Sequence, residues 1–214
     1  MKRGLSFDEI CKSLKTGDLV LCHGTAAESH IIEAVEWSHW SHVGMVVLPE
    51  DIGLEDTKGP LFWESTSSSD GIQDVILKQC KASGPMLVPL KDRLTVDITR
   101  KYDTDFLIRY LDGVLTDKMY SQLKSFIDKV HYLPFPDNAK FLKDFLAGRD
   151  SNRAADKTTY FCSQLVSDTY MSMGIISDRY VGNSYAPKDF SSVEALPFTC
   201  RMFLRDGSYI ELLS

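Results

Sequence analysis

The segment that most constrains the fold of this 214-residue chain runs from His42 to Leu48 and is apolar after its first residue. Its valines favour a β-strand. Because polar and apolar residues do not alternate along it, the strand is expected to be buried on both faces of a sheet. The chain must therefore cover both faces, and its 43% of hydrophobic residues and its length suit one domain with a single core.

Other segments supply the remaining strands and helices. Apolar residues at helical spacing predict helices, two of them opened by capping boxes at Ser6 and Thr25. A strand over 72–77 is expected to form a hairpin with 61–66, and Asp206-Gly207 predicts the turn of a C-terminal hairpin. Strands and helices occur in groups, which favours an α+β fold with a mainly antiparallel sheet. The expected strands are 18–22, 42–48, 61–66, 72–77, 86–90, 201–204 and 209–213, and the expected helices are 7–14, 25–35, 119–130, 141–146 and 162–173.

Charge and hydropathy exclude several classes of protein. The 24 Lys and Arg against 30 Asp and Glu give a net charge of −6, which disfavours a nucleic-acid-binding function. No apolar run approaches the roughly 20 residues that a transmembrane helix needs. The acidic residues of 6–9 stand where a signal peptide would have its apolar core, so we expect a cytoplasmic protein.

The five cysteines, at 11, 22, 80, 162 and 200, show no paired spacing. They therefore predict neither a disulfide framework nor a zinc site. His39 and His42 are three residues apart, but no third ligand lies nearby in the sequence. We expect no metal and no cofactor.

Cys162 differs from the other cysteines because it follows a polar loop and opens a predicted helix. A thiol at that position meets unpaired N–H groups and the positive end of the helix dipole, which favour the thiolate, the nucleophilic form. The alternative is that Cys162 is only a small residue at a helix start. Cys22, beside His23, is a weaker candidate because it ends a strand.

A nucleophilic thiol needs a base, and the base needs a partner that orients it. His42 begins the buried strand, and Glu64 lies in the apolar strand 61–66, where an unpaired carboxylate costs several kcal/mol. If the two strands are antiparallel neighbours, the two side chains can meet. The alternative is a satisfied core histidine and a glutamate on an exposed face.

Four motifs occur in the order Gly17-Asp18-Leu19-Val20, Ser41-His42-Val43-Gly44, Trp63-Glu64-Ser65 and Phe161-Cys162-Ser163-Gln164-Leu165-Val166. In this order the chain resembles the circularly permuted, papain-like NlpC-type cysteine peptidases of the YiiX-like kind, with lecithin:retinol acyltransferases as more distant relatives. The resemblance covers residues 17–190 and is loose over 90–150. It implies one permuted papain-like catalytic domain over 1–214, a partial barrel or sheet packed against helices, with a helical insertion around 100–150.

The same resemblance implies that Cys162 is the nucleophile, His42 the base and Glu64 the third, polar member of a catalytic triad. Relatives often carry Pro-Tyr-Asp near 133–137, where this chain has Phe135. Tyr160 is therefore a candidate to assist the oxyanion, and Ser163 is a second candidate for an oxyanion or substrate contact.

The function implied is that of a hydrolase, a thiol protease or amidase that cleaves cell-wall-type peptides. Two alternatives stay open: a lipid acyltransferase or acyl hydrolase using the same triad, and a binding module without catalysis. Trp37, Trp40 and Trp63 lie near His42 and Glu64 in the sequence and are expected either to line an apolar substrate pocket or to pack in the core. The sequence does not determine the oligomeric state.

Overall fold

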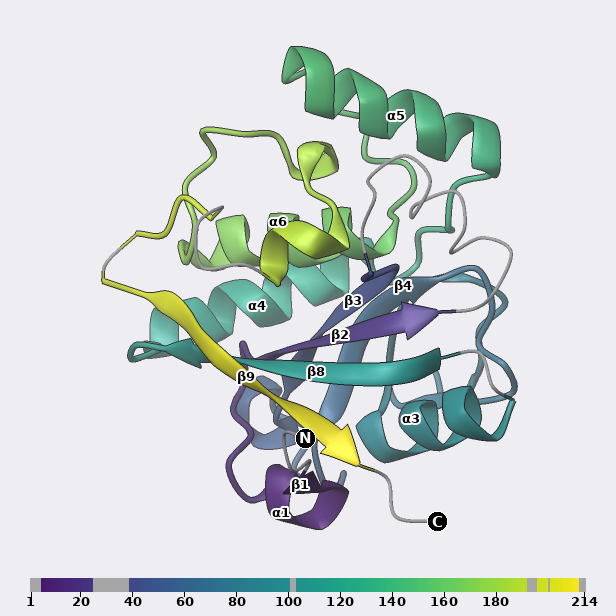
Figure 1. The fold of residues 1–214 in the computed structure, drawn as a ribbon, viewed down its shortest axis with the longest axis vertical. Coiled ribbons are helices and arrows are strands. Elements are labelled where there is room, and N and C mark those ends of the chain that lie inside the picture. Colours follow the sequence, from purple (N-terminus) through teal and green to yellow (C-terminus); the bar gives the residue numbers. More distant parts are fainter. Residues whose placement is uncertain (1–4, 25–38, 101–102, 192–195, 200, 212–214) are drawn as a thin grey trace.

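The computed structural model describes residues 5–24, 39–100, 103–191, 196–199 and 201–211, which form a seven-stranded sheet with helices on both faces (Figure 1). The strand order is β1-β9-β8-β2-β3-β4-β7, and all neighbours are antiparallel except β1 and β9. This confirms the α+β class with a mainly antiparallel sheet. The strands are β1 Leu5–Ser6, β2 Leu19–Gly24, β3 His42–Val47, β4 Leu61–Thr66, β7 Gly84–Pro89, β8 Asp103–Asp112 and β9 Phe203–Glu211.

The helices divide between the two faces of the sheet (Figure 1). On one face, apolar residues of α4 and α6 pack against Leu61 and Trp63 of β4. On the other face, residues of α1 and α3 pack with Phe62 of the same strand. The helices are α1 Phe7–Cys11, α3 Leu90–Thr99, α4 Asp117–Val130, α5 Asn138–Ser151 and α6 Cys162–Met173. Of the short 3-10 turns, η1 Pro49–Ile52 lies between β3 and β4, and η2 Gly182–Ser184 and η3 Pro187–Phe190 follow α6.

Strand β3 lies between β2 and β4, where Cys22 pairs with His42 and Met45 pairs with Trp63. Every residue of β3 after His42 is buried. The prediction of a strand covered on both faces is therefore confirmed, and only its first residue reaches solvent.

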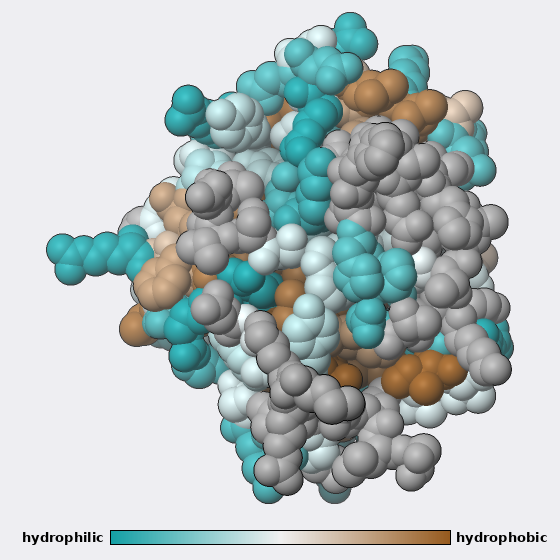
Figure 2. Space-filling view, viewed as in Figure 1, coloured by the Kyte–Doolittle hydropathy of each residue, from teal (hydrophilic) through white to brown (hydrophobic). Residues whose placement is uncertain are grey.

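Helix α6 is buried along most of its length and ends at Gly174, which adopts the left-handed conformation expected of a helix-terminating glycine. Because α6 packs against β3, β4 and α4 at once, its first residue is held in a constrained position. In the described part of the chain, none of the helices has the length and apolarity needed to cross a membrane. Figure 2 shows a largely polar face, with apolar surface over α5, where Leu142 and Leu146 are exposed.

The predicted hairpin between 61–66 and 72–77 is wrong, because β4 pairs with β7. The Asp74 side chain accepts hydrogen bonds from the N–H groups of Ile76 and Leu77, both at 2.9 Å. These bonds turn the chain after two extended residues, so β5 Gln73–Asp74 pairs only with the short β6 Gln79–Cys80.

The C-terminal hairpin is also wrong, because Asp206-Gly207 lies inside β9 instead of forming a turn. Strand β9 pairs with β8 on both sides of a register shift, and a Cβ at Gly207 would lie 2.1 Å from the carbonyl oxygen of Ile108. Glycine therefore permits a close approach of the two backbones within the ladder.

The stretch around 100–150, where a helical insertion is expected, contains α4 and α5 in its second part. Its first part is β8, a strand between β2 and β9 that carries no alternation clear enough to reveal it in the sequence. The predicted helix over 25–35 lies outside the described residues.

Candidate active site

Cys162 is the first residue of α6 and is buried, with 3% of its surface exposed. Its N-cap residue, Phe161, provides no side-chain hydrogen bond to the first turn. The Phe161 ring instead packs edge-on against Phe141 of α5 at 4.9 Å between centroids. The helix start is thus fixed by aromatic packing, and its N-cap side chain offers no oxygen to the first N–H groups.

His42 and Glu64 meet across the pair of strands β3 and β4, with 2.8 Å between His42 Nε2 and Glu64 Oε2. In the register that pairs Met45 with Trp63, Glu64 lies beside Gly44, so the contact with His42 is diagonal along the ladder. A Cβ at Gly44 would come within 2.3 Å of the Phe62 ring. Gly44 therefore leaves room for Phe62, whose ring lies beside the His42 imidazole at 6.2 Å.

The charge of Glu64 determines whether Nε2 of His42 donates or accepts in their hydrogen bond. Burial raises the pKa of Glu64, but Arg93 and His42 lower it more, so its net pKa lies below the ordinary value and the side chain is a carboxylate. A carboxylate only accepts hydrogen bonds, so Nε2 of His42 is the donor. This leaves Nδ1 as the ring nitrogen that does not contact Glu64.

His42 also interacts with the thiol. Burial lowers the pKa of His42, but its interactions with the Cys162 side chain and with Glu64 raise it well above its ordinary value. The His42 imidazole therefore has the Cys162 thiol and the Glu64 carboxylate as polar neighbours. The His42 side chain is 23% exposed and that of Glu64 is 1% exposed, so solvent reaches the imidazole and not the carboxylate.

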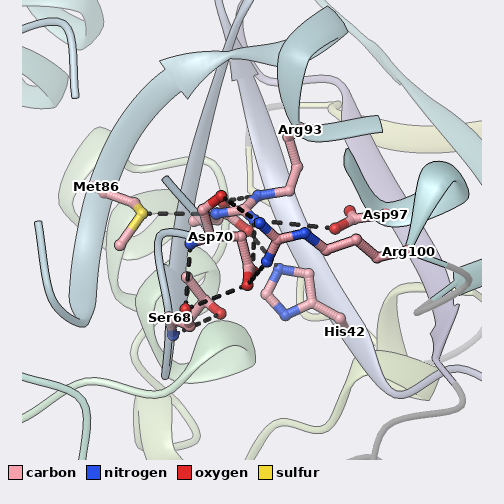
Figure 3. A network of polar contacts seen from close by, with 9 residues as sticks. His42, Ser68, Asp70, Met86, Arg93, Asp97 and Arg100 are labelled. Carbon is pink, nitrogen blue, oxygen red and sulfur yellow. Dashed lines mark hydrogen bonds and ion pairs between the residues drawn. The ribbon is translucent and has the colours of Figure 1, made fainter. Parts of the chain in front are cut away.

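Glu64 has a second charged partner, Arg93 of α3, whose Nε lies 2.6 Å from Glu64 Oε1 (Figure 3). No motif or spacing in the sequence singles out Arg93. The sequence offers only an indirect signal for it. A carboxylate in an apolar strand requires a cation as its partner, but the neighbouring sequence does not identify which cation.

Tyr160 and Ser163, the candidates for oxyanion or substrate contacts, have other partners. The Tyr160 hydroxyl donates to Asp168 Oδ2 at 3.2 Å, and burial followed by the charge of Asp168 raises the pKa of Tyr160 strongly. The Ser163 hydroxyl donates to the carbonyl of Tyr185 at 2.7 Å. Both side chains are buried and fasten α6 to its surroundings, so this geometry directs neither hydroxyl to the Cys162 thiol.

The tryptophans near the site belong to the core in the described residues. Trp63 is fully buried and donates from Nε1 to Thr169 Oγ1 at 3.1 Å, so it offers no surface to a substrate. Trp40 is buried in the same core cluster and packs against Tyr209. For Trp63 and Trp40 the core-packing alternative holds, and Trp37 lies outside the described residues.

Cys22, the weaker nucleophile candidate, is buried in the cluster on the opposite face of the sheet from α6. Within the described ranges, no three His, Cys, Asp or Glu side chains are arranged to hold a metal ion. The absence of a metal or cofactor stays a prediction.

No protein-family model and no curated protein matches this chain. Among solved structures, the crystal structure of the metalloprotein yiiX from Escherichia coli O157:H7 is similar, with a TM-score of 0.48 and 19% identity. The match covers 74% of this chain and 66% of the yiiX chain, slightly less than two thirds of that protein's length. It is a distant likeness in structure.

Proposed function

We propose that this protein is a cysteine hydrolase that cleaves an amide bond through a thioester at Cys162. The observation that supports the proposal is the chain of contacts from a thiol at a helix start, through an imidazole, to a buried carboxylate. A nucleophile, a base and an orienting group in this order form the arrangement that acyl transfer requires.

In the first half of the reaction, His42 takes the thiol proton and the sulfur attacks the carbonyl carbon of the substrate. The C–N bond then breaks, and the imidazolium gives its proton to the leaving amine. In the second half, His42 takes a proton from water, the resulting hydroxide attacks the thioester, the C–S bond breaks, and the imidazolium returns its proton to the sulfur. The products are the carboxylic acid and the regenerated thiol, with Glu64 accepting from Nε2 throughout.

The negative oxygen that forms in each half needs hydrogen-bond donors. The first N–H groups of a helix have no carbonyl partner within it, and Phe161 supplies no side-chain cap. The Cys162 N–H is therefore the donor that we assign to this oxygen, a contribution of about 2.7–4 kcal/mol per donor in other enzymes.

Alkylation of the five thiols by iodoacetamide tests the nucleophile without knowledge of the substrate. We expect Cys162 to react fastest, although it is buried and Cys80 is exposed, and to keep reacting at pH 6, where ordinary thiols are almost fully protonated. The rate at each cysteine is measured by mass spectrometry of peptides. If Cys162 reacts no faster than Cys80 at any pH, the proposal is wrong.

Turnover of candidate substrates tests the reaction. Wild type and Cys162→Ala are incubated with short cell-wall-type peptides and with acyl lipids. Release of amines from peptides, lost in Cys162→Ala, supports the amidase. Acyl release from lipids in the same comparison would replace it with the lipid alternative, and binding without turnover would replace it with a binding module.

A further inference from the structure

Arg93 lies at the centre of a buried network of charges beside the proposed triad (Figure 3). Its side chain is 4% exposed. Nε is 2.6 Å from Glu64 Oε1, Nη1 is 3.2 Å from Asp70 Oδ2, and Nη1 is also 3.8 Å from Asp97 Oδ1. Nη2 lies 3.7 Å from the Met86 sulfur, so the whole guanidinium is surrounded.

The network continues outward to the surface. Asp70, in the turn after β4, accepts from Arg100 Nη1 at 2.7 Å, and the Arg100 side chain is 46% exposed. Charges thus alternate from imidazole to solvent in the order His42, Glu64, Arg93, Asp70, Arg100. Each buried charge has an opposite charge beside it, as desolvated ions require.

The two oxygens of Glu64 have different partners. Oε1 is bonded to Arg93 and Oε2 to His42, so the carboxylate cannot rotate without breaking a charged hydrogen bond. His42 reaches the carboxylate from β3, and Arg93 reaches its other oxygen from α3.

We propose that Arg93 is a positioning residue of the active site, which holds Glu64 charged and oriented so that His42 keeps one nitrogen for Cys162. This inference rests on the proposed function for its catalytic meaning, but the state of Glu64 can be measured by itself. Arg93 acts through Glu64 and does not reach the reacting atoms.

The charge of Arg93 has a direct consequence for proton binding. Burial alone raises the pKa of Glu64, and Arg93 is the largest influence in the opposite direction. Without that cation, the carboxylate is buried beside His42 alone. Its pKa is then expected to rise from the wild-type value, and the loss of its charge on acidification weakens the imidazolium.

The test is a titration of Glu64 by isotope-edited NMR of the glutamate carboxyl carbons, with its signal identified by its loss in Glu64→Gln. We expect a midpoint below 4.5 in wild type, a midpoint clearly higher than the wild-type one in Arg93→Met, and a midpoint near the wild-type one in Arg93→Lys. Arg100→Met is the matched control, because it removes an arginine from the same network at Asp70 and not at Glu64. An unchanged Glu64 midpoint in Arg93→Met overturns the inference.

A second readout links the network to the thiol. On acidification the rate of Cys162 alkylation falls, and the midpoint of this fall is its acid limb. This midpoint should lie about one pH unit or more higher in Arg93→Met than in wild type and be unchanged in Arg93→Lys. A purely structural brace would lower the rate at every pH and leave the limb unmoved, which would also overturn the inference. If Arg93→Met does not fold, Arg93→Gln keeps a hydrogen-bond donor without the charge, and the same upward shifts are expected.

The two proposals can fail separately. If wild-type Cys162 shows no preferential alkylation, the proposed function fails, while the Glu64 titration still decides whether Arg93 holds that carboxylate charged.

Discussion

Two histidines in this protein bond to a carboxylate with the same N–O distance of 2.8 Å, and their surroundings differ in almost every other respect. His42 is partly exposed and lies between Glu64 and the Cys162 thiol. His131, which follows α4, and its partner Asp74 are each 1% exposed. The His131 ring stacks near Trp63, with 6.1 Å between centroids, and among the described residues its Nδ1 has no hydrogen-bond partner.

The carboxylates differ in what holds them. Glu64 has charged partners on both oxygens. Asp74 accepts backbone N–H groups of Ile76, Leu77 and Leu87 as well as His131. Backbone donors fix chain geometry, so the Asp74 pair fastens a turn to β7 and to the end of α4. A histidine–carboxylate contact therefore indicates catalysis only where the second ring nitrogen faces a reactive group.

The largest expected effect separates the two histidines by reactivity. His42→Ala removes the base of the proposed reaction and should lower turnover by about 10²–10⁴-fold, with a matching loss of Cys162 alkylation at neutral pH. His131→Ala is the matched variant, and its alkylation rate should equal that of wild type because its ring faces no thiol. Alkylation kinetics on folded protein check both, and equal losses in the two variants would contradict the comparison.

The next effect separates the two carboxylates by stability. Asp74→Ala leaves three backbone N–H groups and a histidine without their acceptor, so it should lower the free energy of unfolding by about 3–5 kcal/mol. Glu64→Ala should cost less stability, because Arg93 keeps Asp70 and Asp97 beside it, and more reactivity at Cys162. Urea unfolding measures the first quantity and alkylation the second, and the reverse ranking in either would be inconsistent with the roles assigned.

The smallest effect concerns the dependence of stability on pH. Because folding raises the pKa of His42 above 6.5, its contribution to stability is complete below 6.5 and is lost as the pH rises through the folded value. Folding lowers the pKa of Asp74, so its contribution is present above 3.8 and is lost as the pH falls through the folded value.

Urea unfolding over a pH series measures these contributions. The decline of stability above pH 6.5 should be shallower in His42→Ala than in wild type and unchanged in Asp74→Ala. Identical alkaline slopes in wild type and His42→Ala would show that the imidazole gains no protonated-state stabilisation on folding.

Much of the fold could be predicted because its signals are local. The Ser6 capping box opens α1, Gly174 ends α6, and the apolar run after His42 forms the central strand β3. The two predicted hairpins are wrong for a physical reason. Asp74 uses its carboxylate to turn the backbone early, and Gly207 allows a close backbone approach within β9 where a hairpin turn is expected.

The candidate site divides in the same way. The helix start at Cys162 and the isolated charge of Glu64 in an apolar strand are visible along the chain, and so is the position of His42 at a strand end. The bond between Glu64 Oε1 and Arg93 cannot be read along the chain, because Arg93 lies in another element, 29 residues away.

The sequence by itself determined the α+β class, the buried strand, and the helix that presents Cys162, because caps and hydrophobic periodicity act over a few residues. Only the tertiary structure decided that His42 meets Glu64 diagonally past Gly44, that Arg93 holds the far oxygen, and that His131 bonds to Asp74 instead. These contacts depend on strand register and join residues that are 22, 29 and 57 positions apart in the sequence. A buried charge is satisfied by whichever partner the packed chain brings within about 3 Å.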